Sequence, residues 1–162
     1  FTPFTSGELR VSGDFTNNTS TGNGEHGLIL GSLFTGLTRY TGSISGNTFA
    51  DNGLRELEVR IEGTATDGSD DSAFSILNNS LTNSASGSVL LLVENDGASD
   101  LTLTLDGNMA SPILTDLNSS PFNFDLTKPG TGGFTVLPVD VQTRNTGSVG
   151  SSASGAARVT IP

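Results

Sequence analysis

Short stretches of alternating apolar and polar residues, separated by glycine, asparagine and serine, constrain the fold of this chain most strongly. Leu57, Val59 and Ile61 alternate with charged residues, and the alternation recurs at 101–105 with threonine and at 122–126 with phenylalanine. Because successive side chains of a strand point to opposite faces, each stretch predicts a strand with one buried face. The pattern therefore favours an all-β fold.

Further short apolar runs bring the expected total to nine or ten strands, a density typical of a sandwich or a barrel. The run at 88–93, the turn-forming residues 94–97 and the strand at 101–105 together predict a hairpin. Pro138 predicts an edge strand or a bulge. We expect a single Ig-like or jelly-roll β-sandwich, in which residues 1–15 form an N-terminal strand or extension and residues 16–162 form the sandwich domain.

Composition bounds the class of protein. A chain of 162 residues is long enough for one domain with its own core. Its 17 acidic and 7 basic residues give a net charge of −10, which disfavours nucleic acid as a partner. The absence of cysteine excludes disulfides and thiolate metal sites. No apolar run approaches the roughly 20 residues of a membrane helix, so we expect no membrane span.

The first residue bears on where the protein acts. The numbering begins at Phe1 rather than at methionine. This start predicts that a signal peptide has been removed. We therefore expect an extracellular or cell-surface location.

The patterns that carry catalysis or nucleotide binding are weak in this sequence. Residues 22–27 match G-x-G-x-x-G, but they follow no clear strand and precede a segment that glycines break, so they predict no nucleotide site. His26 is the only histidine, and the glycines around it predict a loop, where it would lack the orienting partner that a general base needs. No G-x-S-x-G nucleophile motif is present. The sequence thus predicts neither an enzyme nor a small-molecule substrate.

Two acidic loops are candidate calcium sites. One contains Asp67, Asp70 and Asp71, and the other contains Glu94, Asn95, Asp96 and Asp100. Calcium takes six to eight oxygen ligands, which such loops supply. Neither loop matches the twelve-residue calcium-loop pattern, so solvated turns are the alternative. We expect no other cofactor.

Four asparagines satisfy the N-x-[ST] pattern of glycosylation, namely Asn17, Asn18, Asn78 and Asn118. In an exported protein such sites carry glycans on exposed loops. A chain rich in asparagine, serine and threonine also produces these triplets by chance. The four sites are therefore candidates for modification, with composition alone as the alternative.

The N-terminal segment is the feature that most suggests assembly. It carries four large apolar residues within eleven positions, Phe1, Phe4, Leu9 and Val11. A terminus is usually polar and loose unless other contacts hold it. The segment can pack in its own domain, or it can be donated as a strand to the open sheet of a neighbouring subunit. The second alternative makes it a donor strand.

The middle and end of the chain resemble a known family. The strand, turn and strand at 89–105, with the short strands at 139–141 and 158–161, are similar to the secreted β-sandwich subunits of the TasA/camelysin type, which form bacterial surface fibres, and to Ig-like subunits of archaeal surface filaments. This resemblance implies an exported sandwich that polymerises through an N-terminal donor strand.

Our leading hypothesis is a structural subunit of an extracellular filament or pilus-like fibre, a homopolymer whose partners are copies of itself in a biofilm or on a cell surface. The alternative is a capsid, spike or surface-layer protein of a virus or cell, which would form closed or planar arrays. A carbohydrate-binding module is disfavoured because the chain has no tryptophan and only one tyrosine, Tyr40.

Overall fold

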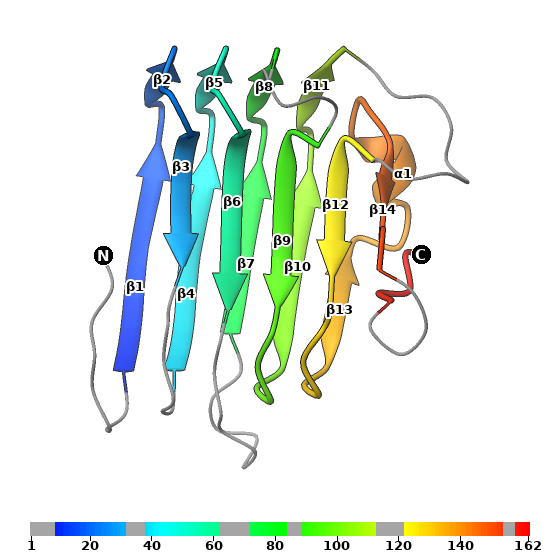
Figure 1. Ribbon diagram of the computed structural model, residues 1–162. Coiled ribbons are helices and arrows are strands. Elements are labelled where there is room, and N and C mark those ends of the chain that lie inside the picture. Colours follow the sequence, from blue (N-terminus) through cyan, green and yellow to red (C-terminus); the bar gives the residue numbers. More distant parts are fainter. Residues whose placement is uncertain (1–8, 32–37, 62–71, 84–88, 113–121, 154–157) are drawn as a thin grey trace.

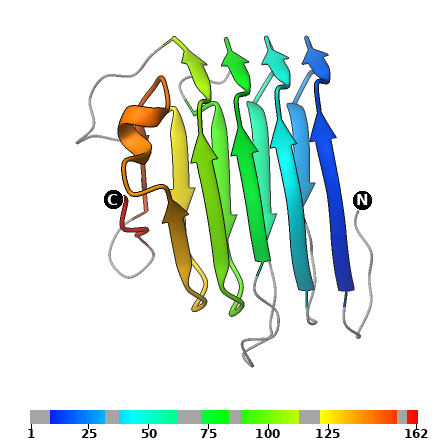
Figure 2. The same ribbon diagram turned by 180° about the vertical axis from the view of Figure 1, so that it is seen from behind.

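The chain folds as a β-solenoid of about four turns. The computed structural model describes residues 9–31, 38–61, 72–83, 89–112, 122–153 and 158–162. Each complete turn, here called a coil, contributes one strand to each of three parallel sheets (Figure 1). Figure 2 shows the molecule from behind, where the successive coils again lie side by side.

Two long sheets face each other and a short sheet joins them at one end (Figure 1). Sheet A contains β1 (Leu9–Thr16), β4 (Thr38–Ser45), β7 (Ser72–Leu77), β10 (Leu101–Asp106) and β13 (Phe134–Leu137). Sheet B contains β2 (Thr19–Thr21), β5 (Thr48–Ala50), β8 (Ser80–Thr82) and β11 (Met109–Ser111). Sheet C contains β3 (His26–Gly31), β6 (Arg55–Ile61), β9 (Leu91–Asn95), β12 (Phe124–Thr127) and β14 (Val149–Gly150).

The coils follow one another along the solenoid. Coil 1 is β1, β2 and β3, and coil 2 is β4, β5 and β6. Coil 3 is β7, β8 and β9, and coil 4 is β10, β11 and β12. The final coil 5 contains β13 and β14, and the short helix α1 (Val141–Arg144) replaces its sheet B strand. The described part of the chain holds no helix of the length and apolarity that a membrane crossing requires.

The predicted β-sandwich is wrong. All named strands pair in parallel, and each pairs with the equivalent strand of the next coil rather than with its neighbour in sequence. The number of strands was also underestimated, since the described residues contain fourteen. The alternation at 57–61 and 101–105 requires only one buried face, and a solenoid meets that requirement as well as a sandwich does.

The predicted hairpin at 88–105 is likewise wrong. β9 belongs to sheet C and β10 belongs to sheet A, so the turn between them crosses from one sheet to the other. The backbone of this turn pairs with the corresponding turn of the next coil, where Gly132 N–H donates to Gly97 C=O at 3.0 Å. Pro138, by contrast, directly follows β13, which is the edge strand of sheet A as predicted.

The core lies between sheets A and C and is built from rows of equivalent side chains. Phe15, Ile44, Ile76 and Leu105 occupy successive register positions of one inward-facing row in sheet A. The opposite wall is formed by inward-facing residues of sheet C, all fully buried: Leu57, Val59, Ile61, Leu91, Val93, Phe124 and Leu126. Stacking of the coils therefore buries one continuous apolar core.

A row of asparagines follows the corner between sheets A and B, and we call it the asparagine ladder: Asn18, Asn47, Asn79, Asn108 and Asn145. The side-chain Nδ2 of each asparagine donates to the Oδ1 of the next, at distances from 2.9 to 3.1 Å. The backbone N–H of each donates to the same Oδ1, at 2.8 to 3.0 Å. These bonds satisfy polar groups that the sharp corner would otherwise leave without partners inside the protein.

Candidate docking surface

The outer side of coil 1 exposes strand edges and core side chains, both of which neighbouring coils cover elsewhere in the solenoid. β1, β2 and β3 are each the terminal strand of their sheet, so no described strand pairs with their outer edges. The apolar interior also ends here. Phe15 is 41% exposed, whereas Ile44, Ile76 and Leu105 in the same row are fully buried. Coil 1 therefore presents both strand edges and core side chains.

The backbone groups on the outer edge of β1 belong to its even-numbered residues. The N–H and C=O groups of alternate residues in a strand point to opposite sides. Phe15 C=O accepts from Asn47 Nδ2 at 2.9 Å, and Asn17 N–H donates to Ser45 C=O at 3.0 Å, so the odd-numbered residues face coil 2. The backbone groups of Ser12, Asp14 and Thr16 consequently face away from the solenoid.

The asparagine ladder also ends at coil 1 with an acceptor. Asn47, Asn79 and Asn108 each accept two hydrogen bonds on Oδ1 from the preceding coil. Asn18 Oδ1 accepts none from the described residues, and one Nδ2 hydrogen of Asn18 turns back to Thr16 C=O at 3.1 Å. Asn23 repeats the arrangement at the next corner, where its N–H and Nδ2 donate to Asn52 Oδ1 at 3.0 and 2.8 Å.

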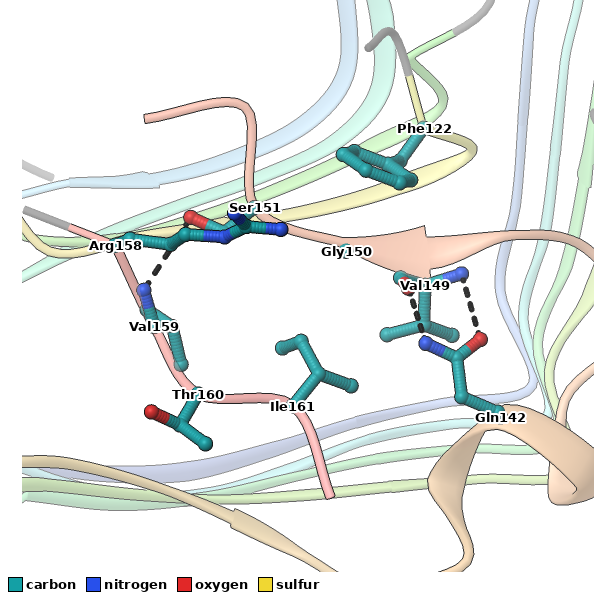
Figure 3. A pocket seen from close by; sticks show the side chains of 9 residues that line it. All are labelled: Phe122, Gln142, Val149, Gly150, Ser151, Arg158, Val159, Thr160 and Ile161. Atoms are coloured by element: carbon teal, nitrogen blue, oxygen red, sulfur yellow. Dashed lines mark hydrogen bonds between the residues drawn. The ribbon is translucent and has the colours of Figure 1, made fainter. Parts of the chain in front are cut away.

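The other end of the solenoid is closed by its own side chains (Figure 3). The side chain of Gln142 in α1 bonds both backbone groups of Val149, since Gln142 Nε2 donates to Val149 C=O and Val149 N–H donates to Gln142 Oε1 at 3.3 Å. Asn145 ends the ladder. Its Nδ2 donates to Leu105 C=O of coil 4, as the other ladder asparagines donate to the coil before them, and also to Val141 C=O of its own coil.

A cavity of about 520 Å³ lies at this closed end, between β14 and the C-terminal segment (Figure 3). Its lining is formed by Phe122, Gln142, Val149, Gly150, Ser151, Arg158, Val159, Thr160 and Ile161. The only charged side chain of this lining belongs to Arg158, which is exposed. The lining offers backbone groups and a guanidinium rather than an acid–base pair, so coil 1 is the stronger candidate for a functional surface.

The structure places the predicted assembly residues only in part. Phe1 and Phe4 lie outside the described residues. Leu9 begins β1, and Val11 is half-buried against the core of its own chain. β1 pairs with β4 along its whole length, from Leu9 to Thr16, and the predicted domain boundary between residues 15 and 16 falls within it.

The predicted metal and nucleotide features receive no support as sites. Asp67, Asp70 and Asp71 lie outside the described residues. Among the residues that the structure does describe, no three histidine or acidic side chains are grouped so that they could hold a metal ion. The glycine pattern at 22–27 runs from the end of β2 into β3, with no helix beside it in the chain.

His26 lies in a strand rather than in a loop, which corrects the sequence-based placement. It begins β3, and its Nδ1 is 3.8 Å from Glu58 Oε2 on β6. Arg55 Nη1 lies 2.7 Å from the same Glu58 oxygen, and Arg60 Nε lies 2.9 Å from Glu94 Oε1. The His26–Glu58 and Arg60–Glu94 contacts join neighbouring strands of sheet C, whereas Arg55 and Glu58 both belong to β6. His26 therefore lies among contacts that hold strands together.

The glycosylation candidates have different environments. Asn17 and Asn78 are exposed corner residues with positive φ values of 57° and 54°. Asn18 uses its side-chain amide in the asparagine ladder. Asn118 lies outside the described residues. Glycosylation at these positions stays a prediction.

Sequence reasoning missed the ladder, although a signal for it was present. An asparagine preceded by asparagine or glycine follows a strand at 17–18, 46–47, 78–79 and 107–108. The ladder asparagines are separated by 29, 32, 29 and 37 residues. Self-similarity at such a period is the signature of stacked repeats.

Comparison of the chain with protein-family models, curated proteins and solved structures found no match.

Proposed function

We propose that this chain is a structural protein of an extracellular or cell-surface assembly, and that it joins the assembly through the outer side of coil 1. The observation that carries the proposal is the exposure of Phe15, whose row partners Ile44 and Ile76 are fully buried. A strand edge beside exposed core side chains is a template for pairing with another chain, which gains main-chain hydrogen bonds and apolar burial together.

The charge distribution supports association at this end. Residues 9–31 contain one basic residue, Arg10, and two acidic residues, Asp14 and Glu25, which gives a formal charge of −1 with His26 neutral. The whole chain carries −10. Most of the negative charge therefore lies outside coil 1, and the electrostatic repulsion that opposes association is small there.

The fold changes how the predicted assembly would work. β1 already pairs with β4 in its own chain, so donation of that strand to a neighbour would first remove it from sheet A. Addition of a strand to the outer edge of β1 requires no such step. Self-association of identical copies, as expected from the sequence, stays a prediction that the following experiment tests.

The experiment compares the chain with a variant whose β1 edge is blocked. Ser12→Pro removes an N–H that faces the open edge and places the proline ring there, which strands tolerate at an edge. Val139→Lys is the matched control, because Val139 is 73% exposed near the other end of the solenoid. Sedimentation and electron microscopy of both variants and of the unaltered chain would report the assemblies formed.

Self-association through the β1 edge predicts that the unaltered chain and Val139→Lys associate, and that Ser12→Pro stays monomeric with an unchanged melting temperature. Fibres would support the filament subunit, and closed or planar arrays would support the capsid, spike or surface-layer protein. Equal association of Ser12→Pro and the unaltered chain would contradict a role of the β1 edge. A monomer in all three samples, at every concentration tested, would contradict self-association.

A further inference from the structure

The coil-to-coil contacts have a direction, and this direction restricts what can cover coil 1. At every step of the asparagine ladder the earlier coil supplies two donors, a backbone N–H and a side-chain Nδ2, and the later coil supplies one Oδ1 acceptor. At the same corner the later asparagine donates to a carbonyl of the earlier coil, as Asn47 donates to Phe15 C=O and Asn79 donates to Ile44 C=O.

Asn18 is therefore an incomplete step of this pattern. Its Oδ1 accepts no hydrogen bond from the described residues. Its second amide hydrogen bonds Thr16 C=O of its own coil, whereas Asn47 and Asn79 each bond a carbonyl of the coil before them. An occupant that completes the step must supply a backbone N–H, a side-chain amide donor and a carbonyl at one corner. A parallel strand followed by an asparagine corner supplies all three, as coils 1 to 4 do inside the chain.

The C-terminal end of a second copy does not fit this requirement. Asn145 has committed both Nδ2 hydrogens to Leu105 C=O and Val141 C=O. Gln142 occupies the backbone groups of Val149 at the edge of sheet C. A head-to-tail stack of identical chains would have to break the Asn145–Val141 bond and the Gln142–Val149 bonds. At coil 1, completion of the ladder moves only the Asn18 amide hydrogen that bonds Thr16 C=O.

The apolar part of the surface fits the same occupant. Val11, Leu28 and Leu30 are only partly buried against the core, and Phe15 is 41% exposed. In coil 2 the residues that pair with Val11 and Phe15, Tyr40 and Ile44, are buried to 2% and 0% exposure because a coil lies on each side. One further coil would give the apolar residues of coil 1 the same burial.

We propose that coil 1 accepts one parallel β-coil of another polypeptide, and that this coil carries an asparagine at the corner after its first strand. The inference rests on the proposed function and adds the class of partner and its direction of approach. The solenoid is thereby extended from its N-terminal end only, because side chains close the C-terminal end.

The test adds a coil to the chain itself, so that single residues of the added coil can be altered. A second copy of residues 9–37 is inserted between residues 8 and 9 of the full chain, which places a copy of Asn18 and a copy of Asn23 before the native coil 1. The control is the same extended chain with Asn18→Ala and Asn23→Ala in the inserted copy alone. Thermal unfolding and amide hydrogen exchange are measured for both extended chains and for the unaltered chain.

We expect the melting temperature of the extended chain to rise by about 5 °C or more, since the added coil buries core side chains. The amides of Ser12, Asp14 and Thr16 should exchange at least about tenfold more slowly, because they become paired. The alanine control should lose most of both effects. An extended chain with unchanged exchange at these amides would overturn the inference, and so would an alanine control that equals it.

A further outcome separates the inference from the proposed function. If the unaltered chain dimerises and the same three amides become protected in proportion to the dimer, the occupant is a second copy paired edge to edge. That result would overturn the parallel coil as the occupant while supporting association through coil 1.

Discussion

Gly132 lies so close to Ser99 that a Cβ at position 132 would be 2.0 Å from the Ser99 carbonyl oxygen. The two residues belong to equivalent turns of successive coils, each joining sheet C to sheet A. Because the obstructing atom is backbone, it cannot rotate away. The contact shows that the turns stack as closely as the strands do.

We therefore predict that Gly132→Ala destabilises the protein by about 2 kcal/mol or more, because the turns must separate. Gly31→Ala in β3 is the control, since no atom of the described residues lies within 4 Å of a Cβ there, and its effect should stay within about 0.5 kcal/mol. Urea unfolding would measure both. Equal stability of the two variants would argue against close stacking of the turns.

The interior of the asparagine ladder should matter more than its open end. Asn79 is buried, donates to Ile44 C=O and Asn108 Oδ1 at 2.8 and 2.9 Å, and accepts two hydrogen bonds from Asn47. Asn79→Ala leaves these partners buried without bonds, so we expect a loss of about 3 kcal/mol or more in the free energy of unfolding. Asn18→Ala, with a ladder partner on one side only, should cost about 1 kcal/mol.

The comparison of these two alanine variants by urea unfolding checks the ladder directly. A smaller loss for Asn79→Ala than for Asn18→Ala would contradict the view that ladder bonds stabilise the corners.

The closure of sheet C by Gln142 gives a local prediction. Gln142→Ala removes the amide that bonds both backbone groups of Val149, so the Val149 amide should exchange with solvent faster. The Phe124 amide donates to Ser148 C=O at 2.9 Å, independently of Gln142, and should keep its exchange rate. Hydrogen-exchange mass spectrometry or NMR would report both. Unchanged exchange at Val149 would mean that other groups close this edge.

Glu56 gives a pH-dependent prediction. Burial raises the pKa of the Glu56 carboxyl above its ordinary value of 4.5, although hydrogen bonds from Asn52 partly oppose the shift. A carboxyl whose pKa is raised on folding contributes stability that is complete below the unfolded pKa and is lost as pH rises through the folded pKa. The free energy of unfolding, relative to that of Glu56→Gln, should therefore fall as pH rises from about 4.5.

Urea unfolding of both proteins between about pH 4 and pH 8 would test this sign. A difference that grows with pH would show that the hydrogen bonds from Asn52 to the charged carboxylate outweigh its burial.

The sequence predicted single strands better than it predicted their partners. The alternation at 57–61 and 101–105 corresponds to β6 and β10, with Leu57, Val59, Leu101 and Leu103 buried as expected. Alternation is a local property, because it depends only on which side chains of one strand face the core. The partner of a strand is a residue about 30 positions away, as Leu57 pairs with Leu91, and no local pattern specifies it.

The candidate site was predicted only in outline. The sequence singled out the N-terminal apolar residues for assembly, which stays a prediction, and the structure places one of them, Val11, against the core on the inner side of coil 1. Phe15 was not singled out, since its exposure follows from its place in the terminal coil rather than from its neighbours in sequence. The asparagine corners could have been found as a repeat, but their hydrogen bonds exist only between stacked coils.

The sequence by itself determined that this chain forms short strands with one apolar face and turns rich in glycine and asparagine. Only the tertiary structure decided that the strands pair in parallel, coil upon coil, and that no described strand lies beyond coil 1 while side chains close the other end. The physical reason is that side-chain alternation depends only on the residues of one strand, whereas pairing depends on contacts between residues distant in sequence. Examples are the Asn18–Asn47 bonds at the coil 1 end and the Gln142–Val149 bonds at the other end.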